Sequence, residues 1–197
     1  MRNPFNLPAV VVAAACLGCA GGARADFIVN GGFETGDFTG WTVTGDAATY
    51  GVDGSNPHSG NFNAFFGQPA NDGAGKTLLM QAVTTTPGLS YVLDFYLMSE
   101  DPGISNPSEF SVQFGSTVLT DQVDHPPFTY HEFQYTVVAT ANVTILTFAF
   151  SNDNAFFDLD DVSLRAVPEP SSLACLAIGV VVLGWYRWRK RSVRVAA

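Results

Sequence analysis

The middle of this 197-residue chain lacks cysteine and nearly lacks basic residues. All three cysteines lie before residue 20 or after residue 170, so no disulfide can stabilise residues 26–166 and no thiol nucleophile is available there. The same stretch holds only Lys76 and Arg165 as bases against 17 acidic residues, a net charge near −15. Taken as a whole, so acidic a surface is repelled by nucleic acid and by anionic lipid. Nucleic acid is therefore excluded as a partner.

The common catalytic motifs are also missing. The chain has no His-Glu-x-x-His zinc motif, no Gly-x-Ser-x-Gly elbow and no phosphate-binding glycine loop. The three histidines, His58, His125 and His131, lie in turn-like, proline-rich segments without metal-ligand spacing. A carboxylate pair for glycoside hydrolysis stays open in so acidic a chain, but no acid stands out as a proton donor in apolar surroundings. The sequence predicts a protein that is not an enzyme.

The first 25 residues are predicted to form a signal peptide. Arg2 supplies a positive start, residues 7–20 are apolar and rich in small side chains, and a small-x-small site precedes the cleavage expected between Ala25 and Asp26. A buried N-terminal helix is the alternative, but the segment is not amphipathic. A lipoprotein cleavage box ending at Cys19 is a weaker alternative, because a cysteine occupies position 16 where an aliphatic residue is usual.

An uncharged apolar run near the C-terminus predicts a single transmembrane helix at about residues 171–188. A spanning helix needs about 20 residues, within a range of about 17 to 25. The basic tail, residues 187–197, belongs on the cytoplasmic side by the positive-inside rule. It includes Arg187, Arg189, Lys190 and Arg191. With the N-terminus exported as well, the domain between the two ends must lie outside the cytoplasm.

A short turn motif, Val167-Pro168-Glu169-Pro170, directly precedes the apolar run. This motif, the apolar helix and the arginine-rich end together resemble the PEP-CTERM sorting signal of exported bacterial proteins. The resemblance implies that residues 167–197 form a sorting signal. It further implies that exosortase, a membrane-embedded transpeptidase, recognises the Pro-Glu-Pro segment at the inner membrane, usually in bacteria that make extracellular polysaccharide. The mature form would then stay anchored or reach the cell envelope or the exterior.

Residues 26–166 are predicted to form one all-β domain. Runs rich in Val, Phe, Tyr and Thr alternate with Gly, Asn, Asp, Ser and Pro clusters. Alternation in Tyr91–Met98 predicts a strand with one covered face, and Val143–Phe150, apolar on both faces, predicts the most buried strand. Strands are expected at 27–29, 41–43, 48–50, 63–66, 77–82, 91–98, 109–114, 117–120, 132–138, 143–150 and 157–164. This pattern favours a two-sheet jelly-roll sandwich over an immunoglobulin-like one, whose Cys–Trp–Cys spacing is absent.

Motifs at both edges of the domain carry a second resemblance. The domain opens with Asn30-Gly31-Gly32-Phe33-Glu34 and Gly40-Trp41-Thr42-Val43, and closes with Leu159-Asp160-Asp161-Val162-Ser163-Leu164. This pattern resembles the galactose-binding-like jelly rolls, which include several families of carbohydrate-binding module. In those domains a structural calcium commonly joins the opening loop to the closing strand. The resemblance implies calcium at Glu34 and Asp160, with carbonyls near Asn30; the alternative is that these carboxylates are solvated.

Sugar binding requires an aromatic platform with polar neighbours. The candidate platforms are Trp41, Tyr50, Phe65, Phe66, Tyr130 and Phe156, with Gln68, Asn71, Asp72 and Gln81 as candidate polar partners. Trp41 is more typical of a core, and no ligand-binding loop can be singled out. The expected function is a non-catalytic envelope or matrix protein with possible polysaccharide binding. A cell-surface adhesion module with protein partners and a secreted glycan hydrolase are the alternatives.

Overall fold

The computed structural model describes residues 26–67, 75–100, 108–124, 126–153 and 155–167. The predicted signal peptide, the sorting motif from Pro168 onward and the predicted transmembrane helix lie outside these residues. Among the residues that are described, no helix is long and apolar enough to cross a membrane.

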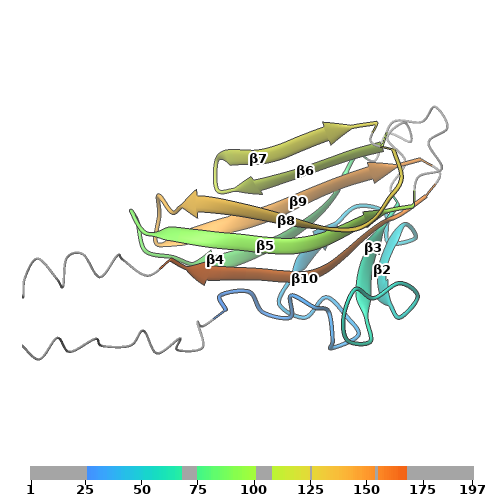
Figure 1. Ribbon diagram of the computed structural model, residues 1–197, viewed down its shortest axis with the longest axis horizontal. Helices are drawn as coiled ribbons and strands as arrows, with labels where there is room; N and C mark the ends of the chain where they lie inside the picture. Colours follow the sequence, from blue (N-terminus) through green and yellow to red (C-terminus); the bar gives the residue numbers. More distant parts are fainter. Residues whose placement is uncertain (1–25, 68–74, 101–107, 125, 154, 168–197) are drawn as a thin grey trace, which may run out of the picture.

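Ten antiparallel strands build two five-stranded sheets packed face to face (Figure 1). One sheet has the order β1-β4-β9-β6-β7 and the other β2-β3-β10-β5-β8. The strands are β1 Thr42–Thr44, β2 Tyr50–Asp53, β3 Asn63–Phe66, β4 Thr77–Thr84, β5 Ser90–Ser99, β6 Ser108–Phe114, β7 Thr117–Val123, β8 Phe128–Val138, β9 Val143–Asn152 and β10 Phe157–Ala166. Neighbours distant in sequence, such as β4 beside β9 and β10 beside β5, make this a jelly-roll sandwich. The predicted all-β fold class is therefore confirmed.

Alternate residues of both sheets meet in an aromatic core. On β5 the predicted set Tyr91, Leu93, Phe95 and Leu97 points inward and is at most 1% exposed. Phe95 packs edge-on against Phe148 of the facing sheet, with ring centroids 5.2 Å apart. Burying such rings supplies the main stabilising term in a domain without disulfides.

Three predicted segments differ from the structure. Residues 27–29 form no strand; Asp26 makes an isolated bridge with Arg165, and the Phe27 amide donates to the Leu164 carbonyl. The second strand runs from 50 to 53 rather than 48 to 50, because residues 46–49 turn around the Asp46 carbonyl, which accepts the Thr49 amide. Strand β8 begins at 128, so His131 lies in a strand and not in a proline-rich turn.

Strand β9 corrects another expectation, since it is not buried on both faces. Val143 is 57% and Ile145 is 50% exposed, because among the described residues no further layer covers the outer side of this sheet. The continuous apolar run identified a strand but could not tell which of its two sides is packed.

A one-residue bulge interrupts β10. Asp160 lies opposite Tyr96 and Ser163 opposite Asp94, so three steps on β10 match two steps on β5. The extra residue is Asp161, whose φ of 51° is in the left-handed region. Such bulges re-aim side chains locally, and here two consecutive carboxylates point into the same area above the sheet.

Candidate functional site

The outward side chains of β3, β10, β5 and β8, here called the polar face, form cross-strand rows of polar and aromatic groups. Tyr96 lies opposite Asp160 on one side and Glu132 on the other, while Asp94 lies opposite Ser163 and Gln134. Directly opposed residues share one face of a sheet. The pleat thus gathers carboxylates, an amide and a phenol from three strands into one patch.

The loop between β2 and β3 folds over this patch and is held by Asp160. One carboxylate oxygen of Asp160 accepts the backbone amides of His58, at 2.9 Å, and Ser59, at 3.1 Å. The other accepts the Asp161 amide at 2.7 Å. Asp160 is fully buried beneath the loop. It fixes the loop conformation by pairing the His58 and Ser59 amides, which would otherwise lack an acceptor in the strand ladder.

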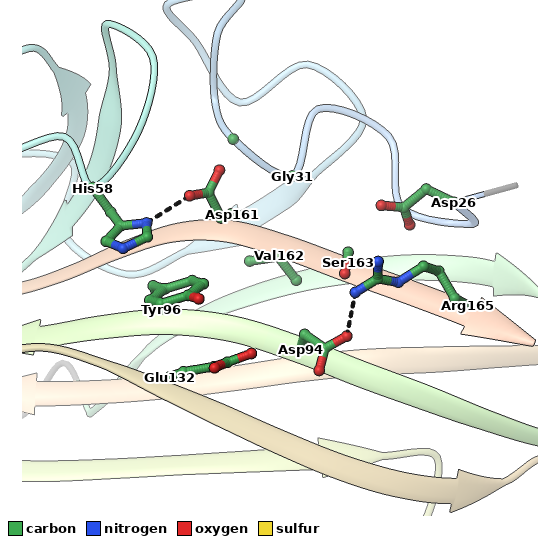
Figure 2. Close-up of a pocket in the computed structure, with 11 residues that line it drawn as sticks. Asp26, Gly31, His58, Asp94, Tyr96, Glu132, Asp161, Val162, Ser163 and Arg165 are labelled. Carbon is green, nitrogen blue, oxygen red and sulfur yellow. Dashed lines mark hydrogen bonds and ion pairs between the residues drawn. The ribbon is translucent and has the colours of Figure 1, made fainter. Parts of the chain in front are cut away.

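An aromatic cluster is the result of that loop position. The His58 ring stacks on Tyr96 with centroids 3.7 Å apart and an angle of 15°, and Tyr130 meets His58 edge-on at 5.1 Å. The His58 Nδ1 atom lies 2.7 Å from a carboxylate oxygen of Asp161 (Figure 2). The Tyr130 hydroxyl donates to the Asn56 carbonyl at 2.6 Å. Stacking and hydrogen bonds together fix the orientation of all three rings.

A shallow hollow of about 460 Å³ lies beside this cluster. Figure 2 shows His58, Tyr96, Glu132 and Asp161 gathered at one end of it, and Arg165 ion-paired with Asp94 at the other. The remaining lining residues are Asp26, Gly31, Gly32, Val162 and Ser163.

A second hollow of about 350 Å³ lies on the same face beyond the loop. Phe65 and the 38% exposed Phe156 line it, their rings edge to face at 5.3 Å. Asp158, only 2% exposed, forms part of the wall and accepts the Asn63 side-chain amide at 2.7 Å. The Asn56 amide donates to Glu100 at 2.8 Å.

Burial shifts the acid–base behaviour of the two carboxyl groups beneath the loop. Desolvation raises the pKa of Asp158 to about 7, and the Glu100 carboxylate adds to this while the Asn63 amide opposes it. Desolvation likewise raises the pKa of Asp160 to about 6, against the Ser59 amide hydrogen bond. Burial and nearby carboxylates also raise the pKa of Tyr130. Among the described residues neither carboxyl has a cationic partner, so each is costly to ionise in the folded protein.

The electrostatic balance of the polar face is strongly negative. The carboxylates that line its two hollows are Asp26, Asp53, Asp94, Glu100, Glu132, Asp158 and Asp161. Among the described lining residues, Arg165 is the permanent cation, and it is ion-paired with Asp94.

The two residues predicted to hold calcium both lie beside Gly32. A Cβ added to Gly32 would lie 3.7 Å from Asp160 Oδ1 and 3.8 Å from Glu34 Cγ, so both side chains border this glycine. Glu34 accepts the Asn61 amide at 2.8 Å and the Phe62 amide at 3.0 Å, which lowers the pKa of its carboxyl. Glu34 and Asp160 thus each hold part of the loop between β2 and β3 by accepting its backbone amides.

Neighbouring oxygens are partly engaged in hydrogen bonds of their own. The Asn30 carbonyl accepts the Trp41 indole N–H at 3.1 Å and the Phe33 amide at 3.2 Å, and the Gly31 carbonyl accepts the Val162 amide. Among the described residues, no group of three or more His, Cys, Asp or Glu side chains is arranged to hold a metal ion. Two carboxylates beside neutral oxygens are nevertheless the hard donor set that calcium prefers.

The structure divides the predicted sugar platforms into two groups. Trp41 and Phe66 are core residues, and Tyr50 packs partly buried against Phe38. Phe65, Phe156 and Tyr130 lie on the polar face or its rim. Gln81 is buried and exchanges hydrogen bonds with the Val29 backbone, so it cannot meet a ligand. Gln68, Asn71 and Asp72 lie outside the described residues.

Sequence reasoning missed the central pair of the site, His58 and Tyr96. His58 was assigned to a turn without a role, and Tyr96 was assigned only to the less covered side of a strand. The signal that could have found Tyr96 was its alternation with Leu97, which places the phenol outside next to Asp94. No local pattern reveals that the loop carrying His58 folds back onto that strand.

Comparison with known families supports the two resemblances found in the sequence. Residues 166–191 match the PEP-CTERM protein-sorting motif, so the first resemblance is confirmed. No curated protein matches the chain.

Solved structures with the same fold include two carbohydrate-binding modules. The chain is similar to TmCBM61, solved with β-1,4-galactotriose, at 19% identity and a TM-score of 0.55, covering 73% of this chain and 99% of that one. It is also similar to the CBM22-1 xylan-binding domain of Paenibacillus barcinonensis Xyn10C, at 13% identity and a TM-score of 0.54, covering 75% and 97%. The second resemblance is thereby confirmed at the level of fold.

A Stig cyclase from Fischerella sp. TAU also shares the fold, at 17% identity and a TM-score of 0.53, covering 74% of this chain and 99% of the cyclase. Identities this low establish the jelly-roll sandwich and nothing finer. Since enzymes and binding modules both use this sandwich, function must be argued from the site.

Proposed function

We propose that residues 26–166 form a non-catalytic polysaccharide-binding module of an exported protein that is sorted through its PEP-CTERM motif. The observation that carries the proposal is the His58–Tyr96 stack, locked by Asp161 and flanked by Tyr130 on an open sheet face. Sugar rings bind by packing their apolar sides on aromatic rings while their hydroxyls meet nearby polar groups. A preformed aromatic surface loses little conformational entropy on binding.

Two hollows on one face suit a chain rather than a single sugar. The first is bordered by the His58–Tyr96 stack, and the second by the Phe65–Phe156 pair, with the loop between β2 and β3 separating them. Carboxylate oxygens of Glu132 and Glu100 are placed to accept hydrogen bonds from hydroxyl groups at either hollow. An extended glycan that crosses the loop would use both.

Charge narrows the class of polysaccharide. Seven carboxylates line the two hollows, and the permanent cation among the described lining residues is already paired. Uronate-containing or sulfated chains would meet like charge on every side, which raises the cost of binding by several kcal/mol. The proposed ligand is therefore a neutral polysaccharide.

Calcium is proposed as a structural cofactor of this module, held by Glu34 and Asp160. The two carboxylates border Gly32 and clamp the loop that carries His58. A bound cation would supply the positive charge that the buried Asp160 lacks. Its chemistry there would be to stabilise the loop, with no part in a reaction.

Sorting is proposed to follow from the C-terminal motif. Exosortase would process the chain at the inner membrane, and the apolar run after Pro170 would anchor it there beforehand. The last described residue, Val167, is the first residue of the Val-Pro-Glu-Pro turn, so the motif follows the sandwich directly.

The proposal is tested with the full chain and its variants in affinity electrophoresis against neutral galactan and xylan and against an anionic polyuronate. Retardation by a neutral polymer, weakened about tenfold or more by Tyr96→Ala, is the expected result for loss of a central aromatic contact. Ile145→Ala on the other sheet is the matched control and should bind normally. No retardation by any neutral polymer would rule out the proposal, and release of reducing ends would favour the hydrolase alternative.

A further inference from the structure

The connections at one end of the sandwich carry no charged residue; Asp26 and Arg165, which form an isolated β-bridge, lie one residue inside it. This end consists of the connections β4–β5, β6–β7 and β8–β9 with their flanking strand ends, residues 84–90, 114–118 and 138–144, together with Ala166 and Val167. We call this the neutral end. Its twenty-one connection residues contain no Asp, Glu, Lys, Arg or His, although the domain as a whole has a net charge near −15.

The opposite end of the molecule is acidic. The connection β1–β2 carries Asp46, and the ends of β2, β5, β7 and β9 carry or precede Asp53, Glu100, Asp124 and Asp153. The acidic residues are thus distributed unequally along the strand direction, and the repulsion expected between this domain and an anionic surface is smallest at the neutral end.

Exposed aliphatic side chains gather at the neutral end. Val118, Val138 and Val143 are each more than half exposed, and Ile145, one pleat further along β9, is 50% exposed. They account for four of the seven large apolar residues that are exposed among the described part of the chain. Apolar side chains without charged neighbours are the composition that enters the headgroup region of a bilayer favourably.

The connections of the neutral end are tied to one another. The Thr85 amide and hydroxyl donate to the carbonyls of Asn142 and Ala141, and Leu89 and Ala139 are linked through the Ala139 amide. The Gly88 amide also donates to the Ala139 carbonyl at 2.8 Å. These bonds between the β4–β5 and β8–β9 connections make the end a fixed surface rather than independent loops.

The chain leaves the sandwich at this same end. β10 terminates at Ala166, and the Val167 amide still donates to the Ser90 carbonyl at 2.8 Å, beside the β4–β5 connection. Only five residues separate Val167 from Leu173, the first large residue of the apolar run, and the six steps between these two residues span about 20 Å at most. The headgroup layer alone is about 5–8 Å thick on each side.

We infer that, in the membrane-anchored precursor, the neutral end rests on the outward lipid headgroup surface, with the polar face standing upright beside it. This inference rests on the anchoring proposed above and is independent of glycan binding. The short tether keeps the sandwich at the bilayer, and the charge distribution selects which end faces the lipid.

Single-cysteine reporters test this orientation, since the domain has no native cysteine. The chain that begins at Asp26, with Cys175→Ser, is reconstituted at low density into phosphatidylethanolamine and phosphatidylglycerol vesicles containing a headgroup nitroxide. A fluorophore is attached at Ser116→Cys in the neutral end or, as the matched control, at Ala48→Cys in the β1–β2 connection. Both positions are exposed. Nitroxide quenching should be several-fold stronger at position 116.

Added charge provides the second measurement. Thr140→Asp, exposed in the neutral end, should lower the membrane-contacting population about fivefold, because one charge near an anionic surface is worth about 1 kcal/mol. Ala47→Asp at the acidic end should leave quenching at position 116 unchanged. Equal quenching at positions 116 and 48 in chains that float with the vesicles overturns the orientation alone, while failure to float overturns the anchoring and the orientation with it. Quenching at 116 that disappears at lower protein density indicates contact with a second copy and also overturns the inference.

Discussion

The two sheets of the sandwich present very different outer faces. The polar face carries Tyr96, Asp94 and Glu132 and is covered in part by the loop between β2 and β3, whereas the outer face of the β1-β4-β9-β6-β7 sheet, here called the aliphatic face, presents side chains such as Met80 and Ile145. Both faces come from the same alternation of strand residues. Alternation decides only that a side chain points outward. What distinguishes the polar face from the aliphatic face is the pair of buried carboxyl groups beneath the folded-back loop.

The largest difference between the faces is expected on removing a loop anchor. Asp160→Ala deletes the acceptor of three backbone amides and should destabilise the domain by about 3 kcal/mol, because buried donors left unpaired cost about 1–3 kcal/mol each and the variant also loses a desolvated carboxyl. Ser111→Ala, a similarly buried outward position on the aliphatic face, should cost less than about 0.5 kcal/mol. Urea unfolding of both variants measures the contrast, which similar midpoints would contradict.

The second difference concerns how the stability of the domain depends on pH. The folded-state pKa is about 7 for Asp158 and about 6 for Asp160, above the usual value of 3.8. The folded state therefore binds protons more tightly than the unfolded state between about pH 4 and 7, and stability falls as pH rises through this window. At about 1.4 kcal/mol per pKa unit, about one unit for Asp158 and less for Asp160 are titrated between pH 6 and 8, so the loss of stability over this range should be about 2 kcal/mol.

Melting curves at several pH values measure this loss. Asp158→Asn should flatten the profile, because the amide keeps the polar contacts without titrating. Asp121→Asn on β7 of the other sheet is the control and should leave the profile unchanged. A stability that rises between pH 5 and 8 would contradict the assignment.

We expect calcium to stabilise the domain through residues on the polar-face side only. At millimolar concentration, with the affinity typical of extracellular sites, it should stabilise the domain by about 1–2 kcal/mol. Differential scanning calorimetry with calcium and with chelator measures the shift. Glu34→Gln should remove the response, and Glu109→Gln on the other sheet should preserve it. Identical melting temperatures of the wild-type protein with calcium and with chelator would contradict calcium binding.

The smallest effect is expected on the aliphatic face away from the neutral end. Met80→Thr on β4 should change the unfolding free energy by no more than about 0.5 kcal/mol, since its side chain is only partly buried, and should leave polysaccharide binding unchanged. Affinity electrophoresis and urea unfolding check this. A clear loss of binding would show that the two faces do not divide function as described.

The sequence allowed the sandwich to be predicted because its signals are local. Alternation in Tyr91–Met98 and the turn residues between strands fix which segments are strands and, for β5, which side is buried. Glu34 and Asp160 both border Gly32, while their role as calcium ligands stays a prediction. The contact between His58 and Asp161 could not be predicted, since the two residues are 103 positions apart and meet only through the fold.

Strand β9 is a case in which burial could not be predicted from the sequence. Val143 and Ile145 look like core residues by composition, yet they lie outside because hydrophobic side chains are common on protein surfaces. Whether such a strand is covered depends on layers contributed by the rest of the chain. The neutral end could be recognised only from the structure, because its three connections are far apart in the sequence.

The bulge at Asp161 makes the candidate site easy to lose by a small change in sequence. Because Asp161 is the extra residue in β10, a chain lacking it would still direct Val162 and Leu164 into the core, and the closing strand would simply become regular. Shortening the strand by that one position would thus erase the partner of the imidazole while sparing the scaffold. Loss of the proposed recognition surface would thus require removal of a single codon, with no change to the interior.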